Sequence, residues 1–522
     1  MLKEEMICYC SEEKILLDNG LSDFFLSMNS LNFVKSFLGK VKAYSHKNFI
    51  TFELIVSLKN QLLIFLKLLE NEFPEDIQRI YDKFNFSKEK TFQKKEFINP
   101  SFSNVKVLSG YSGEGKIMEV KDFVNLFRAR YTEFKKILEN SPELEGLVAI
   151  NKISNDKQKI SIIGMISSKS VTKNQNLVLE VEDFTGKIKI IFSKEKEELY
   201  SLAEDAALDS VLGFSGFGNK EILFANKLIF PEVFLDGGRK KSPLEEYALF
   251  LGDVHFGSKN FLEKDFLKFI NYLNGNNVED SEVKKIKYLF IVGDLITGIG
   301  NYPNQEKDLK LVDLEAQFER VASFLSKIRK DIKIIITPGN HDCVRLMEPQ
   351  PILNEKFAWP IYELENVIVA ENPSMINIGA MQDFEGFNVL VYHGFSFPYY
   401  ANNIPSLMKE RVMNSPEKIM KYLLLHRHLA PTHGSVQYFP SPKDYHLISK
   451  VPDFFVSGHT HKSGVNYVKD VLLISVSSWE SMTPYQEKFG NTPDHCKVPM
   501  INLKTRAVKI LDFETKGEVN GH

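Results

Sequence analysis

Five short segments in the C-terminal half of the chain carry side chains that bind divalent metals. Each follows an apolar, β-rich run: Asp253-Val254-His255, Gly293-Asp294, Gly339-Asn340-His341-Asp342, His393-Gly394 and Gly458-His459-Thr460-His461. They offer carboxylates, imidazoles and one amide but no cysteine, a donor set that favours Mn²⁺-type ions over structural zinc. Two adjacent divalent metals are a device for cutting phosphate esters. These residues therefore predict metal-assisted phosphoester hydrolysis.

The spacing within the segments suggests separate roles. Asp253 and His255 are two residues apart after a strand, so an extended backbone would turn both toward one cation. A carboxylate can bridge two cations, which makes Asp294 the candidate bridge, and Asn340 offers a carbonyl oxygen suited to Mn²⁺ or Mg²⁺. His341 would point elsewhere, toward a phosphate oxygen or the leaving group, as a general acid or hydrogen-bond donor. Three histidines complete the set: His393, His459 and His461.

Strands and helices alternate from about residue 245 to 515, and these elements must position the segments. Near-continuous apolar runs predict strands that are buried on both faces, at residues 247–251, 288–292, 332–336, 389–392, 454–456 and 471–476. Apolar residues at helical spacing predict helices within 262–273 and 314–328. A lone histidine is more often structural, but ligands of layered α/β folds lie on loops beyond strand ends, and all five segments fall there. We therefore expect a metal-binding α/β domain at residues 241–515.

Three further regions precede this domain. Residues 1–75 show apolar spacing typical of helices, and 76–145 suggest a linker followed by a short amphipathic helix, with Arg128 and Arg130 expected on its solvated face. Residues 146–240 contain five short β-rich runs with a helix after the third, which is the order of an OB-fold barrel. The strands offer few surface aromatics for single-strand binding, so a spacer or subunit-contact role is preferred. Residues 516–522 are expected to be a tail.

Length and composition limit the class of protein. The 522 residues are too many for one core. A net charge of -3 means that any nucleic-acid binding must come from local basic surface. The cysteines lack paired spacing, as expected for free thiols in a reducing compartment. There is no apolar run of about 18 residues and no signal-peptide pattern, so we expect a cytoplasmic protein with no membrane partner.

The metal-type segments resemble those of the calcineurin-like metallophosphoesterase superfamily, which includes the nuclease of the double-strand-break repair complex. The surrounding residues resemble the small, exonuclease subunit of the archaeal family-D DNA polymerases. That second resemblance rests on residues 293–303, 338–345 with 348–351, 427–431 with 444–445, and 477–481. It covers residues 245–515 strongly and the OB-like region moderately, whereas the N-terminal helices are similar only in kind.

The resemblance implies a multi-domain α/β protein with an N-terminal helical segment, an OB-fold barrel and a C-terminal metallophosphoesterase domain. It implies a 3′–5′ proofreading exonuclease that acts on DNA beside a large catalytic polymerase subunit, in a heterodimer or higher assembly. It also implies two divalent cations, with Mn²⁺ preferred and Mg²⁺ as the alternative. One would be held by Asp253, His255, Asp294 and His461, the other by Asp294, Asn340, His393 and His459, with His341 as the catalytic residue.

Other interpretations remain open. The chain could be a non-catalytic assembly subunit, although it retains every expected ligand, or a phosphatase or cyclic-nucleotide phosphodiesterase, although the OB-like region argues against that. Arg427 and His428 could contact the DNA backbone, but a structural or subunit-contact role fits equally well. Tyr399 and Tyr400 could stack on an unpaired 3′ terminal base, with buried packing as the alternative.

Overall fold

The computed structural model describes residues 2–515 except 46, 60, 61, 63, 64, 67, 68, 70, 71, 85–103, 112, 114, 116, 236, 277–280 and 489–491. The chain divides into two compact units, Met1–Phe97 and Ile98–His522. The expected tail and part of the expected linker lie outside the described residues. Among the residues that are described, no helix is both long and apolar enough to cross a membrane.

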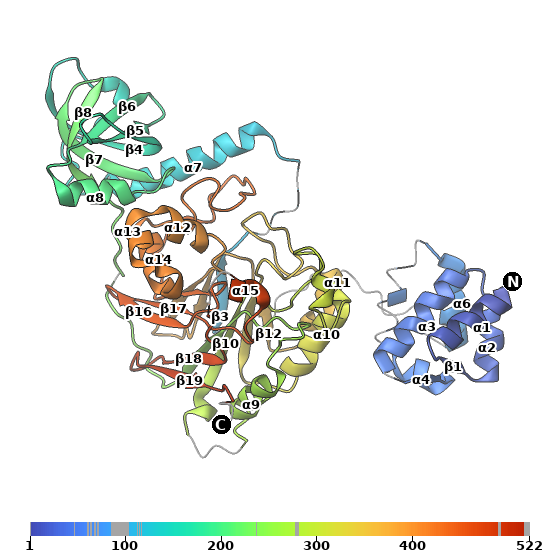
Figure 1. The fold of residues 1–522 in the computed structure, drawn as a ribbon. Coiled ribbons are helices and arrows are strands. Elements are labelled where there is room, and N and C mark those ends of the chain that lie inside the picture. Colours follow the sequence, from blue (N-terminus) through green and yellow to red (C-terminus); the bar gives the residue numbers. More distant parts are fainter. Residues whose placement is uncertain are drawn as a thin grey trace, which may run out of the picture. The chain divides into compact units, whose positions relative to one another are not determined.

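The first unit consists mainly of helices (Figure 1). They enclose a core of aliphatic and phenylalanine side chains. Phe33 and Phe37 lie on one face of α3 and are fully buried, as the apolar spacing of this segment predicts. The Asp76 carboxylate accepts hydrogen bonds from the backbone N–H groups of Asn29 (2.7 Å) and Ser30 (2.9 Å), which ties α6 to the start of α3. The elements are α1 (Leu2–Glu12), β1 (Leu16–Leu17), α2 (Asn19–Leu26), α3 (Leu31–Ser45), β2 (Phe49–Ile50), α4 (Phe52–Ser57) and α6 (Pro74–Phe84).

Residues 158–229 of the second unit form a closed five-stranded barrel. Its strand order is β4-β5-β6-β8-β7, and its core includes Leu179, Ile190 and Phe214. The strands and the helix after the third strand lie where the β-rich runs predict them. Their bounds are β4 (Gln158–Val171), β5 (Leu177–Glu182), β6 (Lys187–Phe192), α8 (Glu197–Asp205), β7 (Val211–Gly218) and β8 (Ile222–Ile229).

Three elements among the described residues of this unit come before the barrel. The helix α7 (Val120–Leu138) is where the amphipathic pattern predicts it, and η1 (Ile150–Lys152) follows. The strand β3 (Val105–Ser109) lies within residues that the sequence assigns to a linker. It pairs antiparallel with β13 and forms the edge of a sheet more than 250 residues away in sequence, with Val105 buried in that sheet's core. A five-residue strand whose partner is so distant leaves little local signal in the sequence.

The rest of the second unit contains two six-stranded sheets in the orders β12-β11-β10-β9-β18-β19 and β16-β17-β15-β14-β13-β3. The first sheet contains β9 (Tyr247–Leu251), β10 (Ile286–Val292), β11 (Lys333–Thr337), β12 (Val367–Val369), β18 (Lys497–Asn502) and β19 (Val508–Asp512). The second contains β3 with β13 (Ser374–Ile378), β14 (Phe387–Val391), β15 (Phe454–Ser457), β16 (Gly464–Val468) and β17 (Val471–Ser475).

Helices cover the outer faces of both sheets (Figure 1). The helices α9 (Glu263–Leu273), α10 (Leu314–Leu325) and α11 (Glu355–Tyr362) pack on the first sheet, and α12 (Phe397–Asn403), α13 (Pro405–Glu410) and α14 (Pro416–Leu425) pack on the second. The remaining helical turns are η2 (Val283–Lys285), η3 (Gln305–Lys307), η4 (Val412–Asn414) and α15 (Pro484–Lys488).

Alternate residues of each central strand face different layers, which explains the continuous apolar runs. In β10, Leu289 and Ile291 pack with the helices, whereas Phe290 and Val292 pack against the other sheet. The strands β9, β10 and β11 are mutually parallel, as are β14, β15 and β17. The carboxyl ends of each parallel set therefore lie at one edge of its sheet, and the predicted metal-type segments follow these ends.

Candidate metal centre

The loops that carry the predicted residues turn sharply after each strand. Five non-glycine residues among them have a positive φ: Asp253 (48°), His255 (54°), Asp294 (49°), His459 (68°) and His461 (54°). This region is sparsely populated by residues with a side chain and tends to occur at functional sites. The extended backbone that the sequence suggests for Asp253 and His255 is therefore wrong. Left-handed turns, rather than alternation along a strand, bring their side chains toward each other.

Glycines let the loops approach one another closely. A Cβ atom on Gly293 would lie 2.2 Å from Nδ1 of His393, and one on Gly339 would lie 2.3 Å from Oδ1 of Asp294. Because real side chains do not tolerate such contacts, glycine is required at both positions. The glycines in the sequence motifs thus make room for the functional side chains of neighbouring loops.

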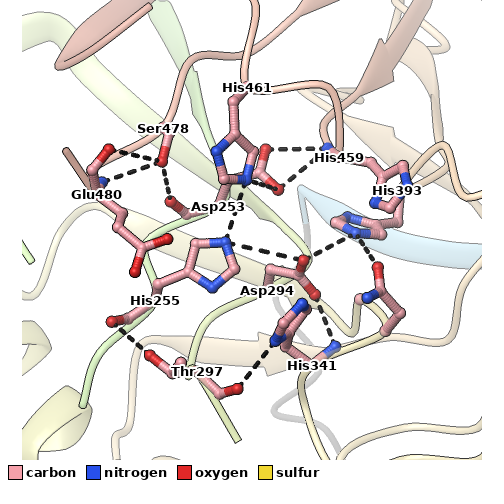
Figure 2. Close-up of polar contacts among 12 residues, drawn as sticks. Asp253, His255, Asp294, Thr297, His341, His393, His459, His461, Ser478 and Glu480 are labelled. Atoms are coloured by element: carbon pink, nitrogen blue, oxygen red, sulfur yellow. Dashed lines mark hydrogen bonds and ion pairs between the residues drawn. The ribbon is translucent and has the colours of Figure 1, made fainter. Parts of the chain in front are cut away.

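One group of donors comes from the loops after β9 and β15. Ligand atoms of Asp253, His255 and His461 all lie within 4.8 Å of one another. Nε2 of His461 is 3.2 Å from Nε2 of His255 and 3.7 Å from Oδ1 of Asp253 (Figure 2). All three residues are buried. We refer to these residues as the first half-site.

A second group comes from the loops after β10, β11, β14 and β15. Ligand atoms of Asp294, His393 and His459 also lie within 4.8 Å of one another. Oδ1 of Asn340 is 3.1 Å from Nε2 of His393, which adds the predicted amide to the group. We refer to Asp294, Asn340, His393 and His459 as the second half-site.

Asp294 lies between the two groups. Its Oδ2 atom is 3.2 Å from Nε2 of His393 and 3.9 Å from Nε2 of His255 (Figure 2). One carboxylate therefore faces both half-sites, as expected of a bridging ligand. Every metal ligand that the resemblance assigns to this chain belongs to one of the two half-sites.

Burial and neighbouring charges shift the pKa values of the carboxylates and imidazoles in the two half-sites. Burial raises the pKa of Asp253 well above its ordinary value, and the charge of Asp294 raises it further. Burial alone would disfavour a charged His393, but the adjacent Asp294 carboxylate outweighs it and raises the pKa of His393 to about 10. Burial and the charge of His393 lower the pKa of His459 to about 3. Burial and His255 lower the pKa of His461. Burial therefore keeps His459 and His461 neutral, whereas Asp253 and His393 hold protons that a bound cation would displace, because ligands bind metals in their deprotonated forms.

Divalent cations fit this donor set. Two neutral imidazoles whose Nε2 atoms lie 3.2 Å apart can share only one proton, whereas a cation between them would use both lone pairs. The mixture of carboxylate, amide and imidazole donors suits Mn²⁺ and related ions. The first half-site and Asp294 would hold one cation, and the second half-site would hold the other.

His341 lies beside the bridging carboxylate without belonging to either half-site. Its backbone N–H donates a hydrogen bond to Oδ1 of Asp294 (2.8 Å), and its ring Nδ1 is 2.9 Å from the carbonyl oxygen of Thr297. Nδ2 of Asn301 also lies 3.0 Å from Nδ1, so Thr297 and Asn301 both hold the ring through this nitrogen, and Nε2 has no hydrogen bond to the described residues. The His341 ring lies 5.0 Å from that of His255, at right angles to it.

Several supporting residues were given no role from sequence. Asp342 is buried, and its carboxylate accepts from the backbone N–H groups of Ile296 (2.9 Å) and Gly339 (2.7 Å), so it joins two of the loops. The hydroxyl of Ser478 (3.1 Å) and the backbone N–H of Trp479 (3.0 Å) both donate to the carbonyl oxygen of Asp253. Asp342, Ser478 and Trp479 lie in segments on which the family resemblance rests, and that resemblance was the sign in the sequence that these positions matter. Their role as loop supports required the structure.

The four proposed DNA contacts are wholly or partly buried. Tyr400 is fully buried, and its hydroxyl contacts Ser435 and Thr432. His428 is buried against Asp444 (2.9 Å), and the Arg427 guanidinium donates to three backbone carbonyl oxygens. Tyr399 is half-buried against Tyr400. Their environments favour the packing role that the sequence left open, because the polar groups of Tyr400, His428 and Arg427 already have partners.

Arg130 shows a clear difference from expectation. The sequence places it on a solvated helix face, but its side chain is fully buried. Nε donates to Oδ2 of Asp444 (2.6 Å), and Nη1 donates to the carbonyl oxygens of Pro431 (2.6 Å) and Asp209 (3.3 Å). Arg130 is on α7, Asp209 directly precedes the barrel strand β7, and Asp444 lies in the two-sheet region. This one side chain therefore connects the helix, the barrel and the two-sheet region.

Comparison with known proteins shows which families this chain resembles. Residues 248–463 match the family model described as calcineurin-like phosphoesterase. The chain is 37% identical to the DNA polymerase II small subunit of Pyrococcus furiosus over 418 residues, 78% of this chain and 66% of that protein. It is 34% identical to the DNA polymerase II small subunit of Methanothermobacter thermautotrophicus over 399 residues, 76% of this chain and 80% of that protein.

The extent of these matches differs. The match spans slightly less than two thirds of the Pyrococcus protein and four fifths of the Methanothermobacter protein. A solved archaeal phosphodiesterase aligns with 51% of this chain and 98% of its own at 13% identity, but a TM-score of 0.25 is too low to bear on the assignment. The relatives and the phosphoesterase match together show that the chain belongs to the family of DNA polymerase II small subunits, with a calcineurin-like metallophosphoesterase domain at its C-terminal end.

Proposed function

We propose that the chain is a 3′–5′ exonuclease that hydrolyses DNA phosphodiesters at a centre of two divalent cations. It would act as a proofreading subunit beside a large catalytic polymerase subunit. The observation that carries the proposal is Asp294, whose carboxylate faces His393 at 3.2 Å and His255 at 3.9 Å. A single carboxylate between two complete donor groups is what a two-cation phosphodiesterase requires.

Residues of the chain would divide the work. When bound, two divalent cations draw charge from the phosphate oxygens and lower the pKa of the attacking water. Water attacks the terminal phosphorus, and the bond from phosphorus to the 3′ oxygen of the preceding nucleotide breaks. The loops hold the donors before substrate arrives, so little reorganisation is needed as charge develops. Mn²⁺ is the proposed cation, with Mg²⁺ as the alternative.

His341 is the proposed catalytic residue. Its ring Nδ1 contacts the carbonyl oxygen of Thr297, and its backbone N–H donates to Asp294, so the residue is held from two sides. With both ring nitrogens protonated, His341 would give its Nε2 proton to the departing 3′ oxygen or donate a hydrogen bond from Nε2 to the phosphate. The 3′ hydroxyl and a 5′ nucleoside monophosphate then complete the balance of the reaction.

The test is digestion of a 5′-labelled primer with a mismatched 3′ end, annealed to its template, in the presence of Mn²⁺. The wild type should give a ladder that shortens from the 3′ end. His341→Ala should lose most turnover, about 100-fold to 10,000-fold for a general acid–base group. The same variant should bind as much Mn²⁺ as the wild type, since His341 is not a ligand.

Other results would point elsewhere. Preference for a small phosphoester over DNA would contradict the nuclease assignment and favour a phosphatase. A chain that cuts nothing, with or without its large subunit, would be an assembly subunit. Loss of bound Mn²⁺ in His341→Ala would show that the histidine is a ligand rather than a catalytic residue.

The remaining regions are proposed to serve the assembly. We assign residues 146–240 to an OB-fold, on the basis of the closed barrel with a helix after its third strand. The expected boundaries of 1–75 for a helical domain and 76–145 for a linker with a short helix are revised, because α6 packs in the helical core and β3 belongs to the second sheet. We assign 241–515 to the phosphoesterase domain and 516–522 to a tail. The barrel is proposed as a spacer or subunit contact, consistent with its attachment through Arg130.

A further inference from the structure

The ligands of the second half-site come from opposite sheets. Asn340 follows β11 of the first sheet, and His393 follows β14 of the second. Oδ1 of Asn340 nevertheless lies 3.1 Å from Nε2 of His393. Neither loop is fixed by the other's strand pairing, so some other contact must set this distance.

Two buried amides connect the backbones of these loops. Asn372 is fully buried, and its Oδ1 accepts from the N–H of His393 (2.8 Å). Its Nδ2 donates to Oε1 of Gln350 (2.7 Å). The Nε2 of Gln350 donates in turn to the carbonyl oxygen of Gly339 (3.3 Å), which is the residue before Asn340. The path from one ligand's backbone to the other therefore consists of two side chains and three hydrogen bonds.

The amide pair is itself held firmly. The backbones of Gln350 and Asn372 exchange hydrogen bonds, with N–H to carbonyl distances of 2.7 and 3.2 Å. Nε2 of Gln350 also donates to the carbonyl oxygen of Arg345 (3.2 Å). Both side chains are buried, so a lost partner would not be replaced easily by water. Such supports fix the orientation of metal ligands as much as the ligands' own rotamers do.

Glu348, two residues before Gln350, makes a further contact with the segment that carries His393. It is buried, and its Oε2 accepts from the Tyr392 hydroxyl (3.0 Å) and lies 3.0 Å from Nε2 of His446. Tyr392 directly precedes His393. Residues 348–350 therefore contact the backbone or a neighbour of both ligands, which gives a structural role to a motif that the function had not explained.

The first half-site has different supports. Ser478 and Trp479 donate to the carbonyl oxygen of Asp253, and the N–H of His459 donates to both carboxylate oxygens of Asp253 at 3.0 Å. Gln350 and Asn372 make none of these contacts. The residues that hold Asp253 therefore differ from the two amides that hold Asn340 and His393, although one of them, His459, belongs to the second half-site.

We propose that Gln350 and Asn372 are positioning residues that hold Asn340 and His393 at metal-binding distance, and that they act on the second half-site alone. This proposal rests on the two-cation centre proposed above. It implies that the second cation can be weakened while the first is kept.

The experiment measures Mn²⁺ bound to the full chain by equilibrium dialysis, without reference to activity. The wild type should bind two ions. Asn372→Ala should retain one tight site and weaken the other by about 10-fold to 100-fold, the usual cost of losing an outer-shell partner. His461→Ala should remove the first site instead. The double variant should have no tight site, because the two changes affect different half-sites.

A matched control is Asn366→Ala. Asn366 is also a buried amide, with Nδ2 donating to the carbonyl oxygen of Ile332 (2.9 Å), but it lies at the opposite end of β11 from Asn340. It should lower stability as Asn372→Ala does and keep both tight ions. Gln350→Glu, which retains an acceptor for Asn372 but cannot donate to Gly339, should reproduce the Asn372→Ala isotherm.

The outcomes separate this proposal from the function on which it rests. Two tight sites in Asn372→Ala would overturn the positioning role while leaving the two-cation centre intact. One tight site remaining in the double variant would show that both changes act on the same half-site, which would also overturn it. A wild type that binds no Mn²⁺ would overturn the two-cation centre and the positioning role together.

Discussion

The Nε2 atoms of His255 and His461 lie 3.2 Å apart at the centre of the first half-site. Burial is the main reason that the pKa of each ring is lowered, so both are neutral at ordinary pH. Two neutral imidazoles oriented in this way gain little from each other, but both gain from a shared cation. The relationship between these histidines explains why metal binding should affect the stability of the domain as well as its activity.

The first prediction follows from that relationship. Adding Mn²⁺ at about 100 times its dissociation constant should stabilise the folded chain by about 2.7 kcal/mol for each occupied site, because the unfolded chain has no assembled site. Thermal unfolding with Mn²⁺ and with a chelator measures the difference. The His255→Ala, His461→Ala double variant should show a smaller difference. Equal melting temperatures with and without Mn²⁺ in the wild type would contradict the assignment of these residues as ligands.

The second prediction concerns the bridge. Asp294→Ala should abolish hydrolysis and weaken both cation sites, because the one carboxylate faces both half-sites. Turnover of the mismatched primer and the Mn²⁺ isotherm measure the two effects. Asp470→Ala is the control, since Asp470 is an exposed carboxylate whose only described ion pair, with Arg239 at 3.6 Å, is on the surface. Full activity in Asp294→Ala would show that the centre is misassigned.

The third prediction concerns the connection between the barrel and the two-sheet region. Arg130→Ala should lower the free energy of unfolding by about 3–5 kcal/mol, because it leaves the buried Asp444 carboxylate without its charged partner. Urea unfolding of the full chain measures this. Arg128→Ala, on the exposed face of the same helix, should change stability by less than about 0.5 kcal/mol. Similar losses in both variants would mean that the buried ion pair contributes little.

The fourth prediction concerns pH. Burial lowers the pKa of His426 to about 4, whereas an unfolded histidine titrates near 6.5. Below pH 6.5 the unfolded chain therefore binds a proton that the folded chain does not, so acid favours unfolding. His426 should cost about 1.4 kcal/mol of stability per pH unit as the pH falls from 6.5 to 4.

The matched comparison isolates this histidine. His426→Phe keeps a ring against Tyr422, whose own ring is 4.1 Å away, but it cannot titrate. Urea unfolding at pH 7, 6 and 5 should give a shallower loss of stability in the variant than in the wild type, whatever their difference at pH 7. Parallel losses in the two proteins would show that His426 does not remain neutral in the folded state.

Sequence by itself determined which residues could form the candidate centre and the layered character of the domain around it. The eight residues from Asp253 to His461 could be named because their types suit divalent metals and because each follows an apolar run. Those runs are continuous because strands such as β10 are buried on both faces, and burial leaves a direct trace in composition. The barrel strands were found as short β-rich runs with a helix after the third.

Tertiary structure decided what depends on contacts between distant segments. The half-sites assemble because five residues adopt left-handed backbone, which residue type does not reveal. Gln350 lies in a segment on which the resemblance rests and Asn372 does not, and only the convergence of the two sheets gives either amide a role. Arg130 and Tyr400 are polar or amphipathic side chains that sequence patterns leave free to be exposed, yet both are buried because distant groups meet their hydrogen bonds. Side-chain chemistry is local and can be read along the chain, whereas burial and partnership are properties of the folded whole.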